Sequence, residues 1–149
     1  MVEADFPECT SFGSVIRFAL ELEKVSAAVY DELAEKQCLA SAHDAFKALS
    51  AAHRKRSDIL EHTRREKLNE MILEPIQDLD SSVYVLDAKV PEPIDIVGAK
   101  AFASKMEDLS SKFYSESSKI AKMLMAEAAR ILDKMGKENE ANKAKLEAL

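Results

Sequence analysis

The chain of 149 residues has few of the residues that interrupt helices, with three glycines and four prolines, and it contains no tryptophan and only two cysteines. So little glycine and proline argues against a β-sandwich or a barrel, whose turns need both. Ala, Glu, Lys, Leu and Ser dominate instead, as in long helices. The sequence therefore predicts a single all-α domain over residues 1–149, long enough to bury about 68–70% of the surface that the unfolded chain exposes.

The two cysteines, Cys9 and Cys38, lie far apart, and no CxxC motif occurs. Their spacing excludes a zinc ribbon or a rubredoxin-type iron centre, both of which need close cysteine pairs. No apolar run approaches the length of a membrane span, and the first residues lack the basic and apolar stretches of a secretory signal. We therefore expect a cytoplasmic protein that keeps its thiols reduced and does not bind a membrane.

The net charge of −6 argues against a nucleic-acid partner, because such proteins neutralise phosphates with an excess of basic residues. The basic segment 53–67 contains acidic residues as well, and a solvated helix face explains it better. The sequence also has no Ser-His-Asp set, glycine-rich phosphate loop or HExxH motif. Hydrolase and nucleotide-binding functions therefore have no support.

Apolar residues recur at alternating spacings of three and four along four stretches, which predicts four amphipathic helices. The first helix is expected to begin near Ser14, whose side chain can cap it, and to carry Glu23 on its apolar face. A loop around residues 37–44 leads to the second helix, where His53 and Arg56 lie on the apolar face. Both predicted helices thus carry charged side chains where a core is expected.

The third helix is expected to begin near Asp95 or Gly98, and Glu107 lies beside its main apolar stripe. The fourth helix carries Asn139 and Asn142 in the middle of its apolar face. The main stripe of the third helix consists of Ala99, Phe102, Met106, Leu109 and Phe113, and the neighbouring row consists of Ala103, Glu107, Ser110 and Tyr114.

A long connection is predicted between the second and third helices, over residues 74–97, because three prolines interrupt this segment. The loop between the third and fourth helices is placed at residues 118–123, and an N-terminal segment, 1–13, precedes the first helix. A long link lets one antiparallel helical hairpin cross over and lie against another. The predicted fold is thus a four-helix bundle of two hairpins joined by a crossover.

The two halves of the chain contain related segments, LELEKVSAAVY and SKMEDLSSKFY. Each has a glutamate seven residues before a tyrosine, so Glu23 corresponds to Glu107 and Tyr30 to Tyr114. Aligning the apolar faces of the second and fourth helices pairs His53 with Asn139 and Arg56 with Asn142. Every predicted helix therefore carries a polar interruption at a similar depth, which favours a duplicated hairpin.

The segments ALELEKVSAAVYDELAE, FKALSAAHRKRSDILE and KMEDLSSKFYSESSK resemble the rubrerythrin-like branch of the ferritin-like superfamily, over residues 14–146. Members of that family bind two iron ions inside the bundle and act as oxidoreductases in peroxide reduction or iron oxidation. Their ligands come from Glu-x6-Tyr on the first and third helices and Glu-x-x-His on the second and fourth. The resemblance implies a ferritin-like bundle and a homodimer, without the rubredoxin module of some relatives.

Carried over residue by residue, the family's metal ligands are only partly retained. Glu23 and Glu107 match the glutamates of the odd helices, whereas His53 and Arg56 stand where the second-helix glutamate and histidine lie. Arginine has no lone pair to give a metal, so a di-iron centre is not expected, and Glu23, His53 and Glu107 could hold at most one ion loosely. The predicted buried polar cluster comprises Glu23, Glu107, Arg56, His53, Tyr30, Tyr114, Asn139 and Asn142.

We hypothesise that salt bridges replace the metal in this cluster. Glu23 and Glu107 repel each other if both are buried and ionised, and Arg56 can make a forked hydrogen bond to one carboxylate. A protonated His53 then balances the other. Such a cluster fixes the register of helices more than it adds stability. These residues and the two tyrosines can equally be structural polar groups with no further role.

Two functions remain open. The first is a structural or interaction role without a cofactor, in a ferritin-like protein with a vestigial metal site. The alternative is a di-iron peroxidase or oxidase, which needs an external electron donor and a fourth-helix register that turns Glu138 or Glu140 inward. Iron storage in a cage would need a working oxidation site or a subunit assembly that the sequence does not indicate.

Overall fold

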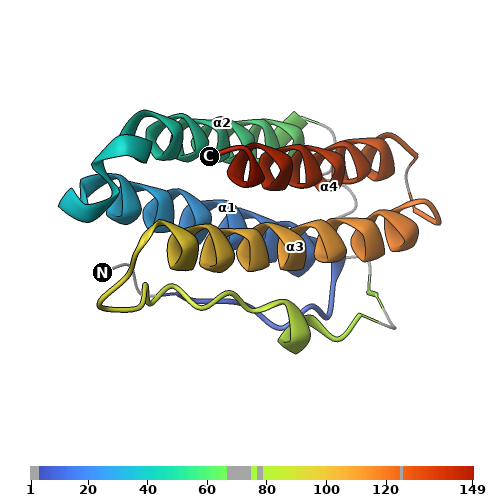
Figure 1. Ribbon diagram of the computed structural model, residues 1–149. Coiled ribbons are helices and arrows are strands. Elements are labelled where there is room, and N and C mark those ends of the chain that lie inside the picture. Colours follow the sequence, from blue (N-terminus) through green and yellow to red (C-terminus); the bar gives the residue numbers. More distant parts are fainter. Residues whose placement is uncertain (1–3, 67–74, 77–78, 125) are drawn as a thin grey trace.

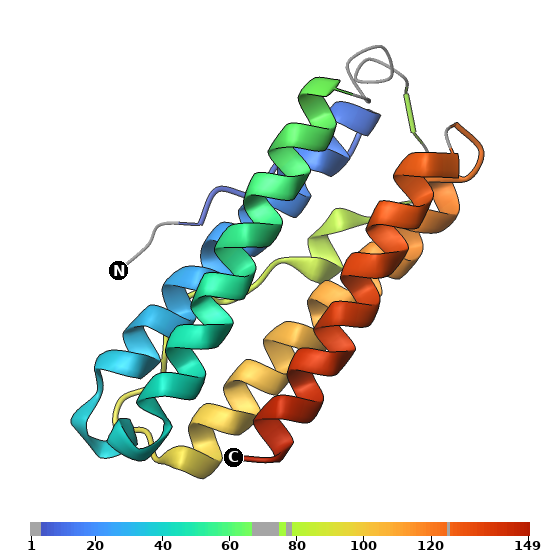
Figure 2. The ribbon, with the colours of Figure 1, turned by 90° about the horizontal axis from the view of Figure 1, so that it is seen from above.

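A computed structural model describes residues 4–66, 75–76, 79–124 and 126–149 (Figure 1). Two antiparallel hairpins, α1 with α2 and α3 with α4, lie against each other as a four-helix bundle (Figures 1 and 2). The predicted all-α bundle is therefore confirmed. Parts of the predicted N-terminal segment and crossover lie outside the described residues. The helices are α1 (Phe12–Glu35), α2 (His43–Glu66), α3 (Ile96–Ala121) and α4 (Ala126–Glu147), with short 3-10 turns η1 (Gln37–Ala42) and η3 (Ser81–Tyr84).

The first helix begins two residues before the predicted start, because Ser11 rather than Ser14 caps it. The backbone N–H of Ser14 donates to the Ser11 hydroxyl over 3.2 Å, and the backbone N–H of Ser11 donates to the Ser14 hydroxyl over 2.9 Å. This reciprocal capping box satisfies two backbone donors that would otherwise lack partners at the helix start. Ser14 thus contributes to the cap from the third helical position.

The third helix begins as predicted, with the Asp95 carboxylate accepting a hydrogen bond from the backbone N–H of Gly98 over 2.8 Å. It runs to Ala121, into the loop predicted at residues 118–123, and α4 begins at Ala126. The predicted loop is therefore placed too early. The segment has neither proline nor glycine, so nothing in its sequence stops the helix sooner.

The connection between the hairpins runs beneath α1 and α3, beside the N-terminal segment (Figure 1). The two segments are joined where the backbone N–H of Ile76 donates to the carbonyl of Thr10 over 3.2 Å, and where the N–H of Cys9 donates to the Ser81 hydroxyl over 3.3 Å. Further along, Lys36 forms an ion pair with Glu92. The described parts of these segments thus lie along the α1/α3 side of the bundle (Figure 1).

The buried face of α3 is wider than the predicted stripe, of which Ala99, Met106 and Phe113 are buried. Phe102 and Leu109 are only half-buried, whereas Ala103 and Ser110 from the neighbouring row are fully buried. The small side chains of this row let the other helices approach α3 closely. The crossover also packs against α3. Glu107, in the same row, consequently lies inside the bundle at 1% exposure.

The described residues contain neither a disulfide nor a helix that could cross a membrane. Both cysteines are free thiols, with Cys9 buried and Cys38 exposed. Burial raises the pKa of the Cys9 thiol despite its hydrogen bond with Ser81, so Cys9 stays protonated near neutral pH. In the described part of the chain, no helix is both long and apolar enough for a membrane span.

Candidate functional site

Four charged side chains lie together in the middle of the bundle. Glu23 comes from α1, His53 and Arg56 from α2, and Glu107 from α3. Each is at most 2% exposed. Charges removed from water to this degree destabilise a protein strongly unless they are paired and hydrogen-bonded, so the partners of these groups determine what the site can do.

His53 bridges the two carboxylates. Its Nδ1 lies 2.7 Å from Oε1 of Glu23, and its Nε2 lies 2.6 Å from Oε1 of Glu107. A neutral imidazole carries one N–H, so donation to both carboxylates requires a proton on each ring nitrogen. Burial lowers the pKa of His53, but the charges and hydrogen bonds of Glu23 and Glu107 outweigh it and raise the pKa to about 9. His53 is therefore an imidazolium at neutral pH.

Arg56 supplies the second positive charge. Its Nε lies 3.2 Å from Oε1 of Glu23, while an Nη donates to Oδ1 of Asn139 over 2.8 Å and to the carbonyl of Met135 over 3.2 Å. The predicted forked hydrogen bond to a carboxylate is thus wrong, because α4 offers two acceptors that turn the guanidinium toward it. The other Nη has no hydrogen-bond partner among the described residues, and the guanidinium carbon lies 5.3 Å from the ring centre of Tyr114.

The two tyrosines reach across from one hairpin to the other. The Tyr30 hydroxyl donates to Oε1 of Glu107 over 2.8 Å, and the Tyr114 hydroxyl donates to Oε2 of Glu23. Burial and the neighbouring negative charge raise the pKa of both phenols well above their usual value. Each tyrosine therefore remains a protonated donor to the glutamate of the other hairpin.

Asn139 completes the hydrogen bonding of Glu107, because its Nδ2 donates to Oε2 over 2.5 Å. Burial raises the pKa of Glu107, but hydrogen bonds and charge from His53, with Asn139 and Tyr30, lower it below its usual value. The cluster then holds two carboxylates, one imidazolium and one guanidinium. These four charges sum to zero, which suits side chains that are almost completely buried.

The predicted and observed members of the site differ at its edges. Asn142 is buried, yet no hydrogen bond in the described part of the chain joins it to the cluster. The backbone carbonyl of Met135 was missed, because a backbone acceptor leaves no signal in the sequence. Gly136 was missed too, although a lone glycine inside a helical pattern indicates close packing. A Cβ at Gly136 would lie 3.3 Å from the Cβ of Tyr114, so the glycine lets α4 approach α3.

The side-chain atoms of the cluster do not provide the ligands that a di-iron centre needs. With both ring nitrogens protonated, His53 has no lone pair for a metal, and Arg56 brings a cation to the same place. The carboxylate oxygens are already engaged with N–H and O–H donors. Across the described residues, no group of three or more His, Cys, Asp or Glu side chains is arranged to hold a metal ion.

The alternative register of α4, with a further glutamate turned inward, does not agree with the structure. Glu140 is exposed and Glu138 is half-buried, and no hydrogen bond from either reaches the cluster in the part of the chain that is described. Asn139, which lies between them, is fully buried. The inward position on α4 is therefore occupied by an amide, as the alignment of the two halves predicted.

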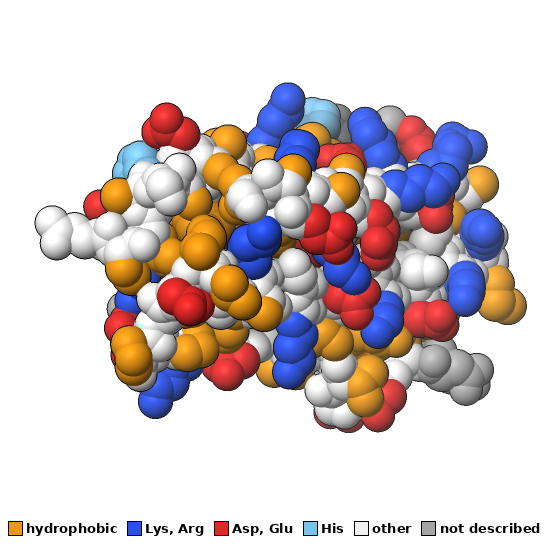
Figure 3. All heavy atoms as spheres, viewed as in Figure 1, with side chains coloured by type: hydrophobic (Ala, Val, Ile, Leu, Met, Phe, Trp, Pro, Cys, Tyr) orange, Lys and Arg blue, Asp and Glu red, His pale blue; other side chains and the backbone are white. Residues whose placement is uncertain are grey.

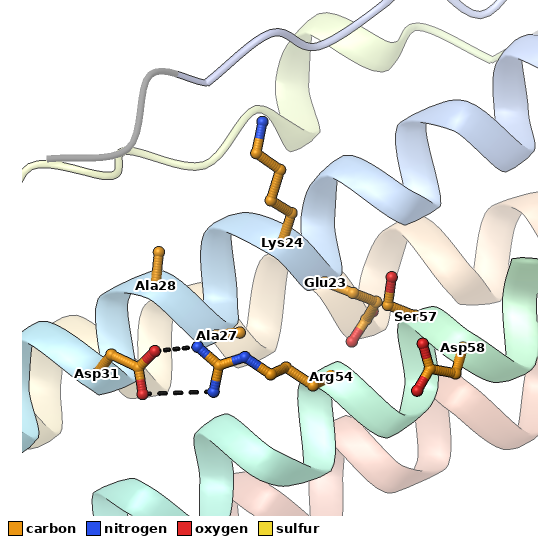
Figure 4. A pocket seen from close by; sticks show the side chains of 8 residues that line it. All are labelled: Glu23, Lys24, Ala27, Ala28, Asp31, Arg54, Ser57 and Asp58. Atoms are coloured by element: carbon orange, nitrogen blue, oxygen red, sulfur yellow. Dashed lines mark hydrogen bonds and ion pairs between the residues drawn. The ribbon is translucent and has the colours of Figure 1, made fainter.

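A surface pocket of about 570 Å³ lies between α1 and α2 and reaches Glu23 from the outside (Figure 4). Asp31 and Arg54 form an ion pair at one end of the pocket, and Lys24 points away from this ion pair (Figure 4). The small side chains of Ala27 and Ala28 are among those that line it. The pocket carries charges of both signs, and the Glu23 oxygens that it approaches are already bonded inside the bundle.

The fold is similar to that of a solved protein described as a dodecameric thioferritin, the bacterioferritin-related protein from Bacteroides fragilis. The TM-score is 0.70 at 16% sequence identity, and the match covers 90% of this chain and 80% of that chain. A scan against protein-family models and a search of curated proteins each gave no match. At this identity the likeness shows the fold alone, a ferritin-like four-helix bundle.

Proposed function

We propose that this protein is a ferritin-like protein of the rubrerythrin-like branch whose di-iron site has been replaced by a neutral salt-bridge cluster. In this proposal it does not act as an oxidoreductase and needs no cofactor. Its role is structural or depends on interactions made by its surface. The cluster of Glu23, His53, Arg56 and Glu107 then serves to hold the two hairpins in register.

One observation carries the proposal, namely that His53 lies between Glu23 and Glu107 with a ring nitrogen on each. A histidine that donates two hydrogen bonds cannot also give a lone pair to a metal. Arg56 supports the same conclusion, since a cation beside Glu23 takes the place of the charge that a metal would provide. Together they balance both carboxylates without an ion.

Iron binding is the second candidate, and the ferritin-like fold favours it. Glu23 and Glu107 keep two inward carboxylates, and loss of the His53 protons would add a nitrogen ligand. This candidate retains the possibility of a peroxidase or oxidase, supplied by an external electron donor. It requires a rearrangement of Arg56, whose positive charge opposes a metal at this place.

For the assembly we propose a homodimer, on the basis of the resemblance to rubrerythrin-like proteins. The bacterioferritin-related protein with the similar fold is a dodecamer. Size-exclusion chromatography with light scattering separates a dimer from a dodecamer or a larger cage. A dodecamer would overturn the proposed dimer and would favour the iron-storage alternative.

The decisive experiment measures metal content by mass spectrometry on protein purified without chelator, before and after anaerobic incubation with ferrous iron. We expect no stoichiometric metal in either sample. About two irons per chain, lost in a Glu23→Ala variant, would overturn the proposal and restore the di-iron enzyme. Iron that binds equally to the parent and to Glu23→Ala lies outside the cluster and leaves the proposal standing.

A further inference from the structure

A second hollow of about 310 Å³ lies between the first half of α2 and the end of α4. In the space-filling view, hydrophobic side chains gather near the C-terminal end of α4 (Figure 3). The hollow, called the α2/α4 groove here, is lined by Ala45, Ala48, Leu49, Ala52, Lys145, Ala148 and Leu149.

The groove exists because α2 and α4 approach each other little. The close backbone packing lies within the hairpins, between α1 and α2 and between α3 and α4. On α2, Ala45, Ala48 and Ala52 recur at spacings of three and four and so form one stripe. Their methyl groups are too short to reach the facing helix, and Leu49, at 4% exposure, lies beside them toward the core.

Lys145 has the single charged side chain among the residues that line the groove. Two other lysines of α4 are paired, Lys137 with Asp133 and Lys143 with Asp108. Lys145 is exposed, and no ion pair among the described residues includes it. The groove therefore combines an apolar wall with one available ammonium group.

We propose that the α2/α4 groove binds a free fatty acid of medium chain length. The acyl chain lies on the alanine stripe, and the carboxylate meets the ammonium group of Lys145. Small-molecule sites usually enclose about 300–1,000 Å³ and combine apolar walls with a few placed polar groups. A volume of about 310 Å³ falls at the small end of that range, which suits a single short acyl chain better than a two-chain lipid.

The test uses the full chain and dodecanoate, kept below its micelle-forming concentration. Titration calorimetry measures the affinity, and methyl NMR spectra report which alanines contact the ligand. We expect one saturable site, with the largest shifts at Ala48 and Ala52. Dodecyltrimethylammonium, which has the same tail and the opposite charge, should bind more weakly.

Matched variants separate the groove from general surface binding. Ala48 and Ala51 are both exposed alanines of α2, but Ala51 does not line the groove. We expect Ala48→Leu to weaken dodecanoate binding by roughly tenfold and Ala51→Leu to leave it unchanged. Lys145→Gln should weaken binding of dodecanoate by roughly two- to fivefold but leave dodecanol unaffected, whereas Lys134→Gln should change neither.

Absence of saturable binding, or equal effects of Ala48→Leu and Ala51→Leu, would overturn the inference. If dodecanoate does not bind and Ala48→Leu instead dissociates an oligomer in light scattering, the groove is an interface between copies of this chain. The inference does not depend on the proposed function, since none of the groove residues belongs to the charge cluster. Failure of one therefore leaves the other unaffected.

Discussion

The hydrogen bond of 2.6 Å between His53 Nε2 and Glu107 Oε1 joins α2 of the first hairpin to α3 of the second. The same histidine holds Glu23 of its own hairpin, so one ring links the two hairpins. Close backbone packing between the hairpins is sparse compared with packing inside each of them. Directional polar bonds in the core therefore set the register of one hairpin against the other.

Replacing Arg56 by alanine should destabilise the fold strongly. The change leaves a carboxylate of the cluster buried without its balancing cation, and breaking a buried pair in this way costs about 3–5 kcal/mol. Urea unfolding followed by circular dichroism measures the loss. Arg54→Ala is the matched control, because Arg54 pairs with Asp31 at the surface and such pairs contribute about 0–1 kcal/mol. A loss below about 1 kcal/mol for Arg56→Ala would contradict the salt-bridge cluster.

Stability should fall in alkaline solution as His53 loses its proton. The pKa of His53 rises from 6.5 to about 9 on folding, so its contribution is fully present below about pH 6.5 and is lost as the pH rises through about 9. The expected loss is of the order of 3 kcal/mol. Unfolding free energies measured across this range test it, and nitrogen NMR of the His53 ring reports the pKa directly. In His53→Gln, the decrease in unfolding free energy that is due to this group should be absent. A His53 ring that titrates near pH 6.5 would disprove the bridging role.

Stability should also fall in acid, because Glu107 has a lowered pKa in the folded protein. A carboxyl whose pKa falls on folding stabilises the protein at pH values above the pKa that it has in the unfolded chain, here 4.5. This contribution is lost as the pH drops through the lower pKa of the folded state. Acid unfolding of the parent and of Glu107→Gln measures the effect. The parent should show the steeper decline, and identical profiles would mean that Glu107 is not ionised in the cluster.

The crossed tyrosines should each contribute to stability through their hydroxyl groups. Tyr30→Phe and Tyr114→Phe keep the ring but remove a donor from a buried carboxylate, which costs about 1–3 kcal/mol. Tyr84→Phe serves as the control, since Tyr84 packs edge-on against Phe113 outside the cluster. In thermal unfolding, the melting temperature of Tyr84→Phe should lie close to that of the parent. Losses at Tyr30→Phe and Tyr114→Phe as small as that of Tyr84→Phe would show that these hydroxyl groups do not stabilise the cluster.

Introducing the ligand set of ferritin-like di-metal proteins should create a metal site. The variant combines His53→Glu and Arg56→His on α2 with Asn139→Glu and Asn142→His on α4. It then carries four carboxylates and two imidazoles facing one another in the bundle, the set that binds two ions in ferritin-like proteins. We expect about two cobalt ions per chain, with visible absorption from coordinated cobalt, and none in the parent. If the folded variant binds no cobalt, the α4 positions do not correspond to the ligand positions of ferritin-like proteins.

The sequence placed the four helices and the cluster residues on their inner faces, because both follow from local periodicity. Glu23, His53, Arg56 and Asn139 each interrupt an apolar row, and a row at helical spacing identifies the buried face without knowledge of the partner. The predicted α3 stripe is confirmed at Ala99, Met106 and Phe113, but the buried face extends to the neighbouring row, and the end of α3 was predicted too early. The local pattern is compatible with more than one buried row and more than one end of α3. Packing of the crossover and of α4 against α3 determines which of them occurs.

By itself, the sequence determined the helical class, the two hairpins and the identity of the charged residues, since composition and spacing depend on neighbours along the chain. Only the tertiary structure decided which atoms pair. His53 touches both glutamates, Arg56 turns to α4 instead of making a forked bond, and Asn142 stays outside the network. Such choices depend on distances between helices that are set by the whole core, down to the single glycine that brings α4 against Tyr114.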